Sequence, residues 1–368
     1  MNINPIFEKI REGNTSFFVF NNKKKDKGPG KKLDIPFYNP AMQLNRDLSV
    51  VLCQWLINNN KKKIRLIDGL AASGIRGYRF ANELEGDFEI IINDWDLNAF
   101  DLIKKNFESF NFNNVLISNE NLNVLLSSDN FNYIDIDPFG SPAYFLDSAI
   151  RSINHNGIIA CTATDTATLC GVYPKVCFRR YGSVPFHSNV MKEVGIRILL
   201  GFICRTAGIY DKAIQPILSY TTDHYFRVYV KISNGIKQAN KSMDKLQIIK
   251  SGAAISYEKI KKDTGPIWMG KIQNDNIIKE LITILFEKQI GNMNKLWKLL
   301  DILFEESNQQ AFFYTTDSLA SYLKKSPLKM DIIFEKIKSK GYNITRTHFS
   351  PTGFKTSVPF NELIKELL

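Results

Sequence analysis

The strongest constraint on the fold is an alternation of short apolar strands with amphipathic helices over residues 64–162. The hydrophobic periodicity predicts strands at 64–67, 89–93, 115–117, 133–136 and 158–162, and helices near 48–57, 74–84, 97–110 and 143–153. Strands that alternate with helices in this way form a parallel sheet covered by helices on its faces.

The chain beyond residue 162 predicts how this sheet is completed. Residues 188–207 have the pattern of a long amphipathic helix, and 214–221 and 225–232 alternate apolar and polar residues as hairpin strands do. A parallel sheet closed by an antiparallel hairpin is the arrangement of S-adenosylmethionine-dependent methyltransferases, whereas dehydrogenase sheets usually lack the hairpin. We therefore predict an α/β fold with a Rossmann-like class I methyltransferase domain.

The predicted strand 133–136 ends on an acid, a proline and an aromatic residue: Asp137, Pro138 and Phe139. Proline ends the strand ladder because it has no N–H group, and open α/β sheets bind ligands at the carboxyl ends of their strands. A carboxylate accepts hydrogen bonds from an exocyclic amine and a ring stacks on a flat base, so these residues suit chemistry on a nucleobase nitrogen. The alternative is a plain turn in which Asp137 caps the next helix.

Residues 66–79 combine a strand end at Asp68, a turn of small residues that includes Ala71, and a helix start. Small residues let the backbone approach a ligand, and a helix N-terminus offers free N–H groups. The next strand ends at Asp94, where a carboxylate commonly takes ribose hydroxyls. The pattern predicts a nucleotide-containing cofactor, and Arg76 suits the carboxylate of a methionine moiety. A tight turn without a ligand is the alternative.

Composition favours a polyanionic partner inside a cell. The chain has 48 basic and 37 acidic residues, a net charge of +11, and neutralising phosphates releases counterions. The 5 cysteines contain no C-x-x-C pair, which argues against a disulfide framework and a zinc ribbon. Because residues 1–16 lack the apolar core of a signal peptide and no run approaches the ~18 apolar residues of a membrane span, we expect a cytoplasmic protein.

Three further segments bear on nucleic acid binding. Residues 21–32 predict a basic loop that either is solvated or contacts phosphates. About twenty residues after 165 lack clear periodicity, which predicts a functional loop; its Arg179 and Arg180 either contact phosphates or stay solvated. Helical patterns at 277–288, 293–304, 318–324 and 331–340, followed by a wing at 342–359, predict a winged-helix-like module.

Together these motifs resemble the tRNA guanine-N2 dimethyltransferases that modify guanine 26, the Trm1 family. The resemblance spans nearly the whole chain and rests on FYNP (37–40) with Met42, NRD (45–47), DGLAASGIR (68–76), DPFGSP (137–142), TDT (164–166), RYG (180–182), RILL (197–200), GPIW (265–268) and RTHF (346–349). Any one of these motifs is weak, but their order and chemistry together are specific.

The resemblance implies roles for individual residues. The expected contacts of S-adenosylmethionine are Arg46, Arg76, Asp94, Glu120 and Asn121. Asp137 is expected at the reacting amine of guanine 26, with Phe37 and Phe139 on either side of a flipped base. Our own hypothesis for the mechanism adds the Pro138 carbonyl, which would accept one hydrogen of that amine. Trp95, next to Asp94, either packs in the core or lines the adenine pocket.

The resemblance also implies a division of the chain. We predict an N-terminal extension (1–45), a methyltransferase domain (46–232), a linker (233–264) and a C-terminal domain (265–368) that helps to hold tRNA. Many relatives carry a cysteine cluster in the linker, read as a zinc site, but residues 233–265 contain no cysteine. We therefore expect no metal and a loosely ordered linker. Separately, we expect the enzyme to be a monomer. Glu120 stands where the family often has Asp near the strand end that contacts the adenine.

Other functions fit parts of the pattern. An acid, a proline and an aromatic residue at a strand end also serve methyltransferases that act on an amino group of a DNA base, and activity on DNA would identify one. A nicotinamide-dependent oxidoreductase would bind the dinucleotide instead of S-adenosylmethionine. A non-catalytic RNA-binding protein would bind no cofactor, which the presence of Asp137 beside an intact cofactor turn argues against.

Overall fold

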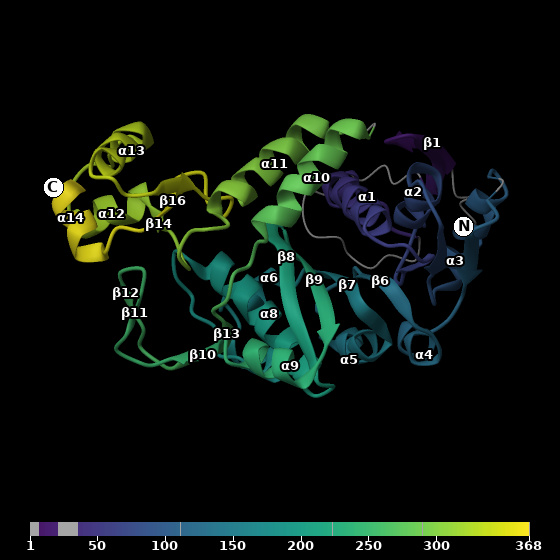
Figure 1. The fold of residues 1–368 in the computed structure, drawn as a ribbon, viewed down its shortest axis with the longest axis horizontal. Helices are drawn as coiled ribbons and strands as arrows, with labels where there is room; N and C mark the ends of the chain where they lie inside the picture. Colours follow the sequence, from purple (N-terminus) through teal and green to yellow (C-terminus); the bar gives the residue numbers. More distant parts are fainter. Residues whose placement is uncertain (1–6, 21–35, 111, 223, 289, 368) are drawn as a thin grey trace, which may run out of the picture.

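The computed structural model describes residues 7–20, 36–110, 112–222, 224–288 and 290–367 (Figure 1). At its centre lies a seven-stranded sheet in the order β5-β4-β3-β6-β7-β9-β8. Its strands are β3 (Ile64–Asp68), β4 (Phe88–Asn93), β5 (Val115–Ser118), β6 (Phe131–Ile136), β7 (Ile153–Ala163), β8 (Lys212–Thr222) and β9 (Tyr225–Asn234). Strands β3 to β7 pair in parallel, and β9 is antiparallel to β7 and β8. The predicted parallel sheet with a closing hairpin is confirmed.

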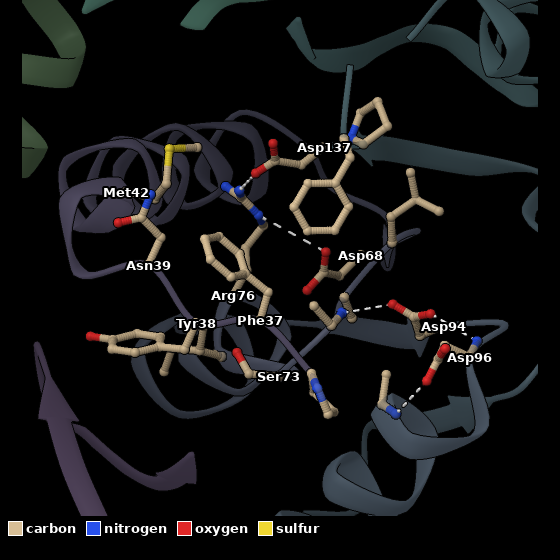
Figure 2. A pocket seen from close by; sticks show the side chains of 18 of the residues that line it. Phe37, Tyr38, Asn39, Met42, Asp68, Ser73, Arg76, Asp94, Asp96 and Asp137 are labelled. Atoms are coloured by element: carbon tan, nitrogen blue, oxygen red, sulfur yellow. Dashed lines mark hydrogen bonds and ion pairs between the residues drawn. The ribbon is translucent and has the colours of Figure 1, made fainter. Parts of the chain in front are cut away.

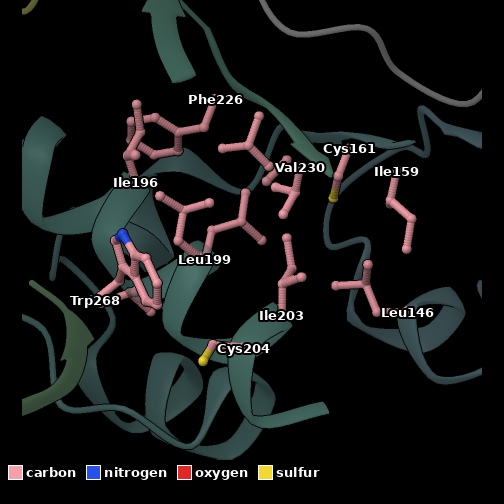
Figure 3. Close-up of a cluster of buried hydrophobic side chains, with 14 of the residues drawn as sticks. Leu146, Ile159, Cys161, Ile196, Leu199, Ile203, Cys204, Phe226, Val230 and Trp268 are labelled. Atoms are coloured by element: carbon pink, nitrogen blue, oxygen red, sulfur yellow. The ribbon is translucent and has the colours of Figure 1, made fainter. Parts of the chain in front are cut away.

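Helices cover both faces of the sheet, because successive strand residues point to opposite sides and both sides are apolar. One core is shared with α4 (Leu122–Ser128), α5 (Ala143–Ser152) and α8 (Met191–Gly208). The other is shared with α1 (Gln43–Asn58), α2 (Ile75–Glu83), α10 (Asp275–Glu287) and α11 (Met293–Glu306). Figure 3 shows the first core, where Leu199 and Ile203 of α8 lie near Val230 of β9. The packing fixes the strand ends that carry the site.

The roughly twenty residues after 165 were predicted to be a functional loop, and the prediction of a loop is wrong, while a function of the segment stays a prediction. The segment contains α6 (Thr166–Leu169) and α7 (Pro174–Tyr181). The apolar pattern is weak because Phe178 of α7 is exposed, while only Cys177 and Tyr181 of that helix are buried.

Residues 233–264 were expected to be loosely ordered, and the structure differs here as well. The segment contains α9 (Ile236–Met243), which packs on β8, and β10 (Leu246–Ile249), which pairs with β13 (Thr264–Trp268). Between them lies the small hairpin of β11 (Ala254–Ile255) and β12 (Glu258–Lys259). The order comes from contacts with the main sheet domain, which the local composition does not reveal.

Residues 314–367 have a small core of their own. It is built from α12 (Thr316–Leu323), α13 (Met330–Ser339) and α14 (Phe360–Leu367) on a sheet of β14 (Tyr314–Thr315), β16 (Gly353–Thr356) and β15 (Ile344–Arg346). Two helices followed by a two-strand wing match the predicted element order. The winged-helix assignment and the domain boundaries stay predictions.

The N-terminal residues form a hairpin of β1 (Phe7–Glu12) and β2 (Thr15–Phe20), and the latter strand was predicted. The hairpin packs on α2 and on α3 (Leu97–Phe107). The predicted basic loop 21–32 lies outside the described residues. Within the described ranges, no helix has the length and apolar character needed to cross a membrane.

Candidate functional site

A cavity of about 360 Å³ opens where the carboxyl ends of β3, β4 and β6 meet (Figure 2). These three strands are adjacent in the sheet, so the loops after them converge at one edge. The segment before α1, with the short 3-10 helix η1 (Pro40–Met42), forms another wall. The cavity lies at the sheet edge that the sequence predicted for ligand binding.

Most of the predicted site residues line this cavity: Phe37, Arg46, Asp68, Ala71, Arg76, Asp94, Trp95, Asp137, Pro138 and Phe139. Glu120, Asn121, Arg179 and Arg180 do not line it. Asn39, Met42, Asp96, Phe145 and Thr164 also line it but were not assigned a role from the sequence. Asn39, Met42 and Thr164 stood inside motifs noted there, so the signal existed without a specific function.

The turn between β3 and α2 approaches the cavity with its backbone. Gly69 N–H donates to the Asp135 carbonyl at 3.1 Å, and Ala71 N–H donates to the Asn93 carbonyl at 2.9 Å. Gly74 precedes α2 with a φ of 76°, a left-handed conformation that glycine adopts at little cost. The turn therefore presents small residues and a helix N-terminus to the cavity, as an anionic or nucleotide ligand requires.

Asp94, after β4, is held by the main chain. Its Oδ2 accepts from Ala72 N–H at 2.8 Å, and its Oδ1 accepts from Asp96 N–H at 3.0 Å. Burial raises the pKa of Asp94, although these backbone hydrogen bonds oppose the rise. Trp95 beside it is 62% exposed, so it is not a core residue. The pair offers an acceptor and a flat apolar surface at one end of the cavity.

Arg46 of α1 is oriented by the N-terminal hairpin. Its Nε donates to Glu12 at 2.8 Å, Nη2 also contacts Glu12, and Nη2 donates to the Asn39 carbonyl at 3.0 Å. Burial would raise the pKa of Glu12, but Arg46 and the Tyr38 hydroxyl outweigh burial and lower it. Among the described residues, no group accepts from Arg46 Nη1. That nitrogen remains available for an anion in the cavity.

Arg76 of α2 has a different environment from the one the sequence suggested. Nη2 donates to Asp137 Oδ2 at 2.5 Å, and Nη1 donates to Asn45 at 2.8 Å and to Ser49 at 2.9 Å. Nε lies 3.4 Å from Asp135. All three guanidinium nitrogens are thus engaged by protein groups, so Arg46 is better placed than Arg76 to meet a cofactor carboxylate.

Asp68 is nearly buried next to the same charges. Its Oδ2 accepts from Gly77 N–H at 3.1 Å, and its Oδ1 lies 3.9 Å from Arg76 Nε. Burial raises the pKa of Asp68 to about 7, opposed by Arg76 and reinforced by repulsion from Asp135 and Asp137. The direction of this pKa shift favours the neutral form of Asp68, the form that adds no negative charge next to Asp137.

Phe37 and Phe139 lie at the mouth of the cavity in edge contact, with ring centroids 5.5 Å apart and planes at 62°. A base held between them needs the rings to separate and align, which the 49% exposure of Phe139 permits. The Phe139 turn itself is fixed, because Gly140 N–H donates to the Thr164 hydroxyl at 2.6 Å and Thr164 N–H donates to the Gly140 carbonyl at 2.9 Å.

The four residues outside the cavity have structural partners or are exposed. Arg180 pairs with Asp165 at 3.0 Å, and Arg179 is exposed on the same helix, α7. The Tyr181 hydroxyl bonds Asp165 and receives a hydrogen bond from Ser141, so α7 is tied to the turn after β6. Asn121 caps α4.

Within the described part of the chain, the hydrogen bonds of Glu120 come from its main chain: its N–H donates to Asn93 Oδ1, and its carbonyl accepts from Asn93 Nδ2. The residue range that the structure describes contains no group of three or more His, Cys, Asp or Glu side chains placed to hold a metal ion.

The cavity residues fit a nucleotide linked to an amino acid. Asp94 offers carboxylate oxygens for ribose hydroxyls, Trp95 and Ala71 offer apolar surface for a base, and Arg46 Nη1 is available for a carboxylate. S-Adenosylmethionine has these three parts. The volume falls within the range usual for small-molecule sites.

Comparisons with known proteins agree with this geometry. A model of the N2,N2-dimethylguanosine tRNA methyltransferase family matches residues 25–368. Over 356 residues, the chain is 38% identical to the tRNA (guanine(26)-N(2))-dimethyltransferase of Pyrococcus furiosus, covering 89% of this chain and 91% of that protein. It is 34% identical over 352 residues to the Methanobrevibacter smithii protein of the same name, covering 90% of each.

A solved structure gives the same result. The complex of Trm1 from Pyrococcus horikoshii with S-adenosyl-L-methionine superposes with a TM-score of 0.87 and 34% sequence identity. The superposition covers 98% of this chain and 99% of that chain. The similarity therefore extends through the cavity and the C-terminal residues alike.

Proposed function

The chain belongs to the N2,N2-dimethylguanosine tRNA methyltransferase family, and we propose that the cavity at the ends of β3, β4 and β6 is its active site. The enzyme methylates N2 of guanine 26 in tRNA with S-adenosylmethionine as methyl donor. The observation that carries the site assignment is that the acid, the arginines and the aromatic rings expected for this reaction line one cavity.

The cofactor is held along the cavity from Trp95 to Arg46. Asp94 would accept hydrogen bonds from the ribose hydroxyls. Trp95 and Ala71 would contact the adenine, and Arg46 Nη1 would pair with the methionine carboxylate. When bound, S-adenosylmethionine supplies an electrophilic methyl group on its sulfonium. Glu120 and Asn121 contribute to cofactor binding through the turn after β5, where Glu120 N–H donates to Asn93 Oδ1.

Asp137 activates the guanine amine. The N2 lone pair is delocalised into the ring, so positioning supplies much of the rate. Asp137 Oδ2 stays on Arg76, while Oδ1, which has no hydrogen-bond partner among the described residues, accepts one amine hydrogen and the Pro138 carbonyl accepts the other. Asp137 stabilises the positive charge that develops on N2 and receives or relays the departing proton. One N–H remains after the first transfer, so a second turnover gives the dimethylated base.

The base and the rest of the tRNA are held by separate surfaces. Guanine 26 leaves the stack and enters between Phe37 and Phe139. Arg179 and Arg180 contact tRNA phosphates. Their helix, α7, lies beside the site because Tyr181 ties it to the turn after β6 through Ser141. Residues 265–368 help to hold the tRNA, and the enzyme works as a monomer in the cytoplasm.

Calorimetric binding of S-adenosylmethionine and of its decarboxylated analogue tests the cofactor assignment. If Arg46 pairs with the carboxylate, the wild type binds the analogue at least about tenfold more weakly, the range of a charge-assisted hydrogen bond. Arg46→Gln should bind both compounds with similar affinity. The control Arg151→Gln changes an exposed surface pair and should behave as the wild type. Equal affinities of the wild type for the two compounds would remove Arg46 from the cofactor site.

A further inference from the structure

A buried ion pair lies behind the cavity, between neighbouring parts of the sheet. Arg227 of β9 binds Asp135 of β6 through both of its terminal nitrogens, Nη1 to Oδ1 at 3.1 Å and Nη2 to Oδ2 at 2.6 Å. Both side chains are 0% exposed, and neither lines the cavity. Arg227 Nη1 also donates to the Thr162 hydroxyl at 2.8 Å. Two opposite charges are therefore paired out of contact with solvent, behind the strand ends that form the cavity.

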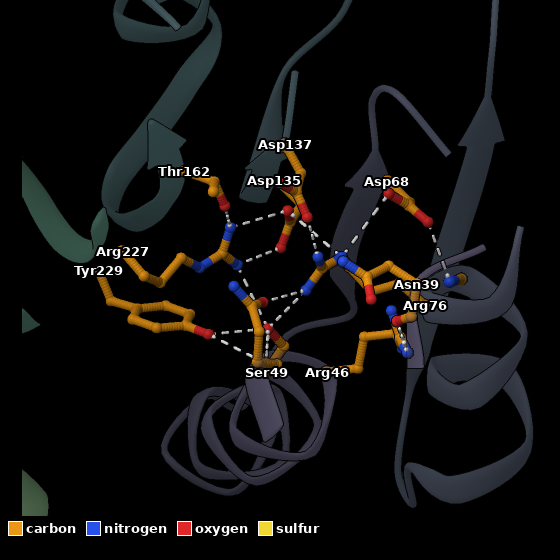
Figure 4. Close-up of polar contacts among 12 residues, drawn as sticks. Asn39, Arg46, Ser49, Asp68, Arg76, Asp135, Asp137, Thr162, Arg227 and Tyr229 are labelled. Carbon is orange, nitrogen blue, oxygen red and sulfur yellow. Dashed lines mark hydrogen bonds and ion pairs between the residues drawn. The ribbon is translucent and has the colours of Figure 1, made fainter. Parts of the chain in front are cut away.

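This pair continues into the site through Arg76 (Figure 4). Asp135 Oδ1 lies 3.4 Å from Arg76 Nε, and Arg76 Nη2 donates to Asp137 Oδ2 at 2.5 Å. The four side chains form a row of alternating charge from β9 to the turn after β6. Only the last member, Asp137, is as much as 21% exposed. The orientation of Asp137 therefore depends on where Arg76 is held.

Uncharged groups fix the row from the side. The Ser49 hydroxyl of α1 accepts from Arg76 Nη1 at 2.9 Å and from Arg227 Nη2 at 3.3 Å. The Tyr133 hydroxyl donates to Asp135 Oδ2 at 2.7 Å. A hydroxyl that contacts both arginines sets the spacing between them. With Thr162 of β7, these hydroxyls hold the row from three separate elements, which leaves few alternative positions for the Arg76 guanidinium.

The charges of this row are costly for the fold. Removing ions from water carries a penalty that pairing often fails to repay, and apolar replacements of buried pairs are frequently as stable. Burial would raise the pKa of Asp135, but Arg227 and Arg76 outweigh burial and lower it, so Asp135 stays ionised at neutral pH. The pair lies directly behind Asp137, one guanidinium away from it.

We propose that Asp135 and Arg227 are positioning residues that hold Arg76, and through it Asp137, so that Asp137 Oδ1 meets the guanine amine. This inference rests on the proposed function of Asp137. Without Asp135, the Arg76 guanidinium would be free to move toward Asp68, 3.9 Å from its Nε, or toward a cofactor carboxylate. Asp135 and Asp137 pair with different nitrogens of the same guanidinium, so Asp135 holds Arg76 through a contact separate from the one to the reacting acid.

Arg227→Lys is the direct test, because lysine keeps the charge but loses the two-pronged contact. We expect kcat for tRNA methylation to fall about 10- to 100-fold, the cost of a small misplacement of a reacting group, while KM for S-adenosylmethionine stays within about twofold. The matched control is Arg197→Lys. Arg197 pairs with Glu193 at 2.7 Å with side chains 3% and 0% exposed, but it lies on α8, away from the cavity. It should lower the melting temperature similarly and leave kcat unchanged.

The Asp137→Asn background separates positioning from general damage. If Arg227 acts through Asp137, Arg227→Lys should not lower the residual kcat of Asp137→Asn any further. An equal loss in both backgrounds, or a folded Arg227→Lys enzyme with wild-type kcat, overturns the proposal.

If Arg227→Lys does not fold, Thr162→Val decides. This substitution removes only one hydroxyl contact of Arg227 and should lower kcat about threefold, and wild-type kcat overturns the proposal. Absence of methylation by the wild type would instead refute the proposed function.

Discussion

Replacing Asp137 by Asn perturbs the reaction itself with little change in shape. Asn keeps an oxygen that can accept the Arg76 hydrogen bond, 2.5 Å long in the native site, so the cavity should persist. The change removes the negative charge that stabilises N2 and the group that takes its proton. Positioned acid–base groups contribute about 10²- to 10⁴-fold, so kcat should fall by that factor, or about 3–5 kcal/mol of transition-state stabilisation.

Single-turnover methyl transfer to a tRNA transcript measures this loss, and calorimetry should give an S-adenosylmethionine affinity within about threefold of the wild type. Asp147→Asn is the matched control, because this substitution makes the same chemical change on α5, at a side chain that is 56% exposed. Its kcat should equal that of the wild type. An Asp137→Asn enzyme that retains kcat within about threefold would refute the role of this carboxylate.

Three other predictions concern the base, the core and the C-terminal contacts. Phe139→Ala should lower kcat/KM for tRNA by a factor that corresponds to about 1–3 kcal/mol of lost stacking free energy. An unchanged kcat/KM would exclude the contact between Phe139 and the base. Leu199→Ala removes a side chain that is 0% exposed and should cost about 2–5 kcal/mol in urea unfolding; a cost below about 1 kcal/mol would show that the core collapses around the gap. Burial would raise the pKa of Glu306, but His348 and Lys355 outweigh burial and lower it to about 2. Its stabilisation is therefore present above its ordinary pKa of 4.5 and disappears as pH falls toward 2. Glu306→Gln should unfold more easily than the wild type at pH 7, with a difference that shrinks in acid; a constant difference would contradict the assignment.

The strands and the reacting edge could be predicted from the sequence because their signals are local. Each strand of the parallel sheet is a short apolar run, and Asp94 and Asp137 directly follow such runs. In a parallel sheet, residues after adjacent strands share one edge. This rule was sufficient to predict that Asp68, Asp94 and Asp137 line one cavity.

Contacts between distant segments could not be predicted in the same way. Glu12 was placed in an extension, yet it orients Arg46 across 34 positions of the chain. Arg76 was assigned to a cofactor carboxylate because its partner Asp137, 61 positions away, leaves no sign in the local pattern. The helix α7 was missed because it buries few side chains, so its sequence lacks an apolar face.

Nucleoside mass spectrometry of an unmodified tRNA transcript, incubated with the protein and S-adenosylmethionine, shows whether this chain methylates guanine 26 at N2. A transcript with another base at position 26 is the control. We expect N2-methylguanosine and N2,N2-dimethylguanosine in the first transcript and neither in the control. Methylated guanosine of equal amount in both transcripts, or none in either despite cofactor binding, would contradict methylation of guanine 26 by this enzyme.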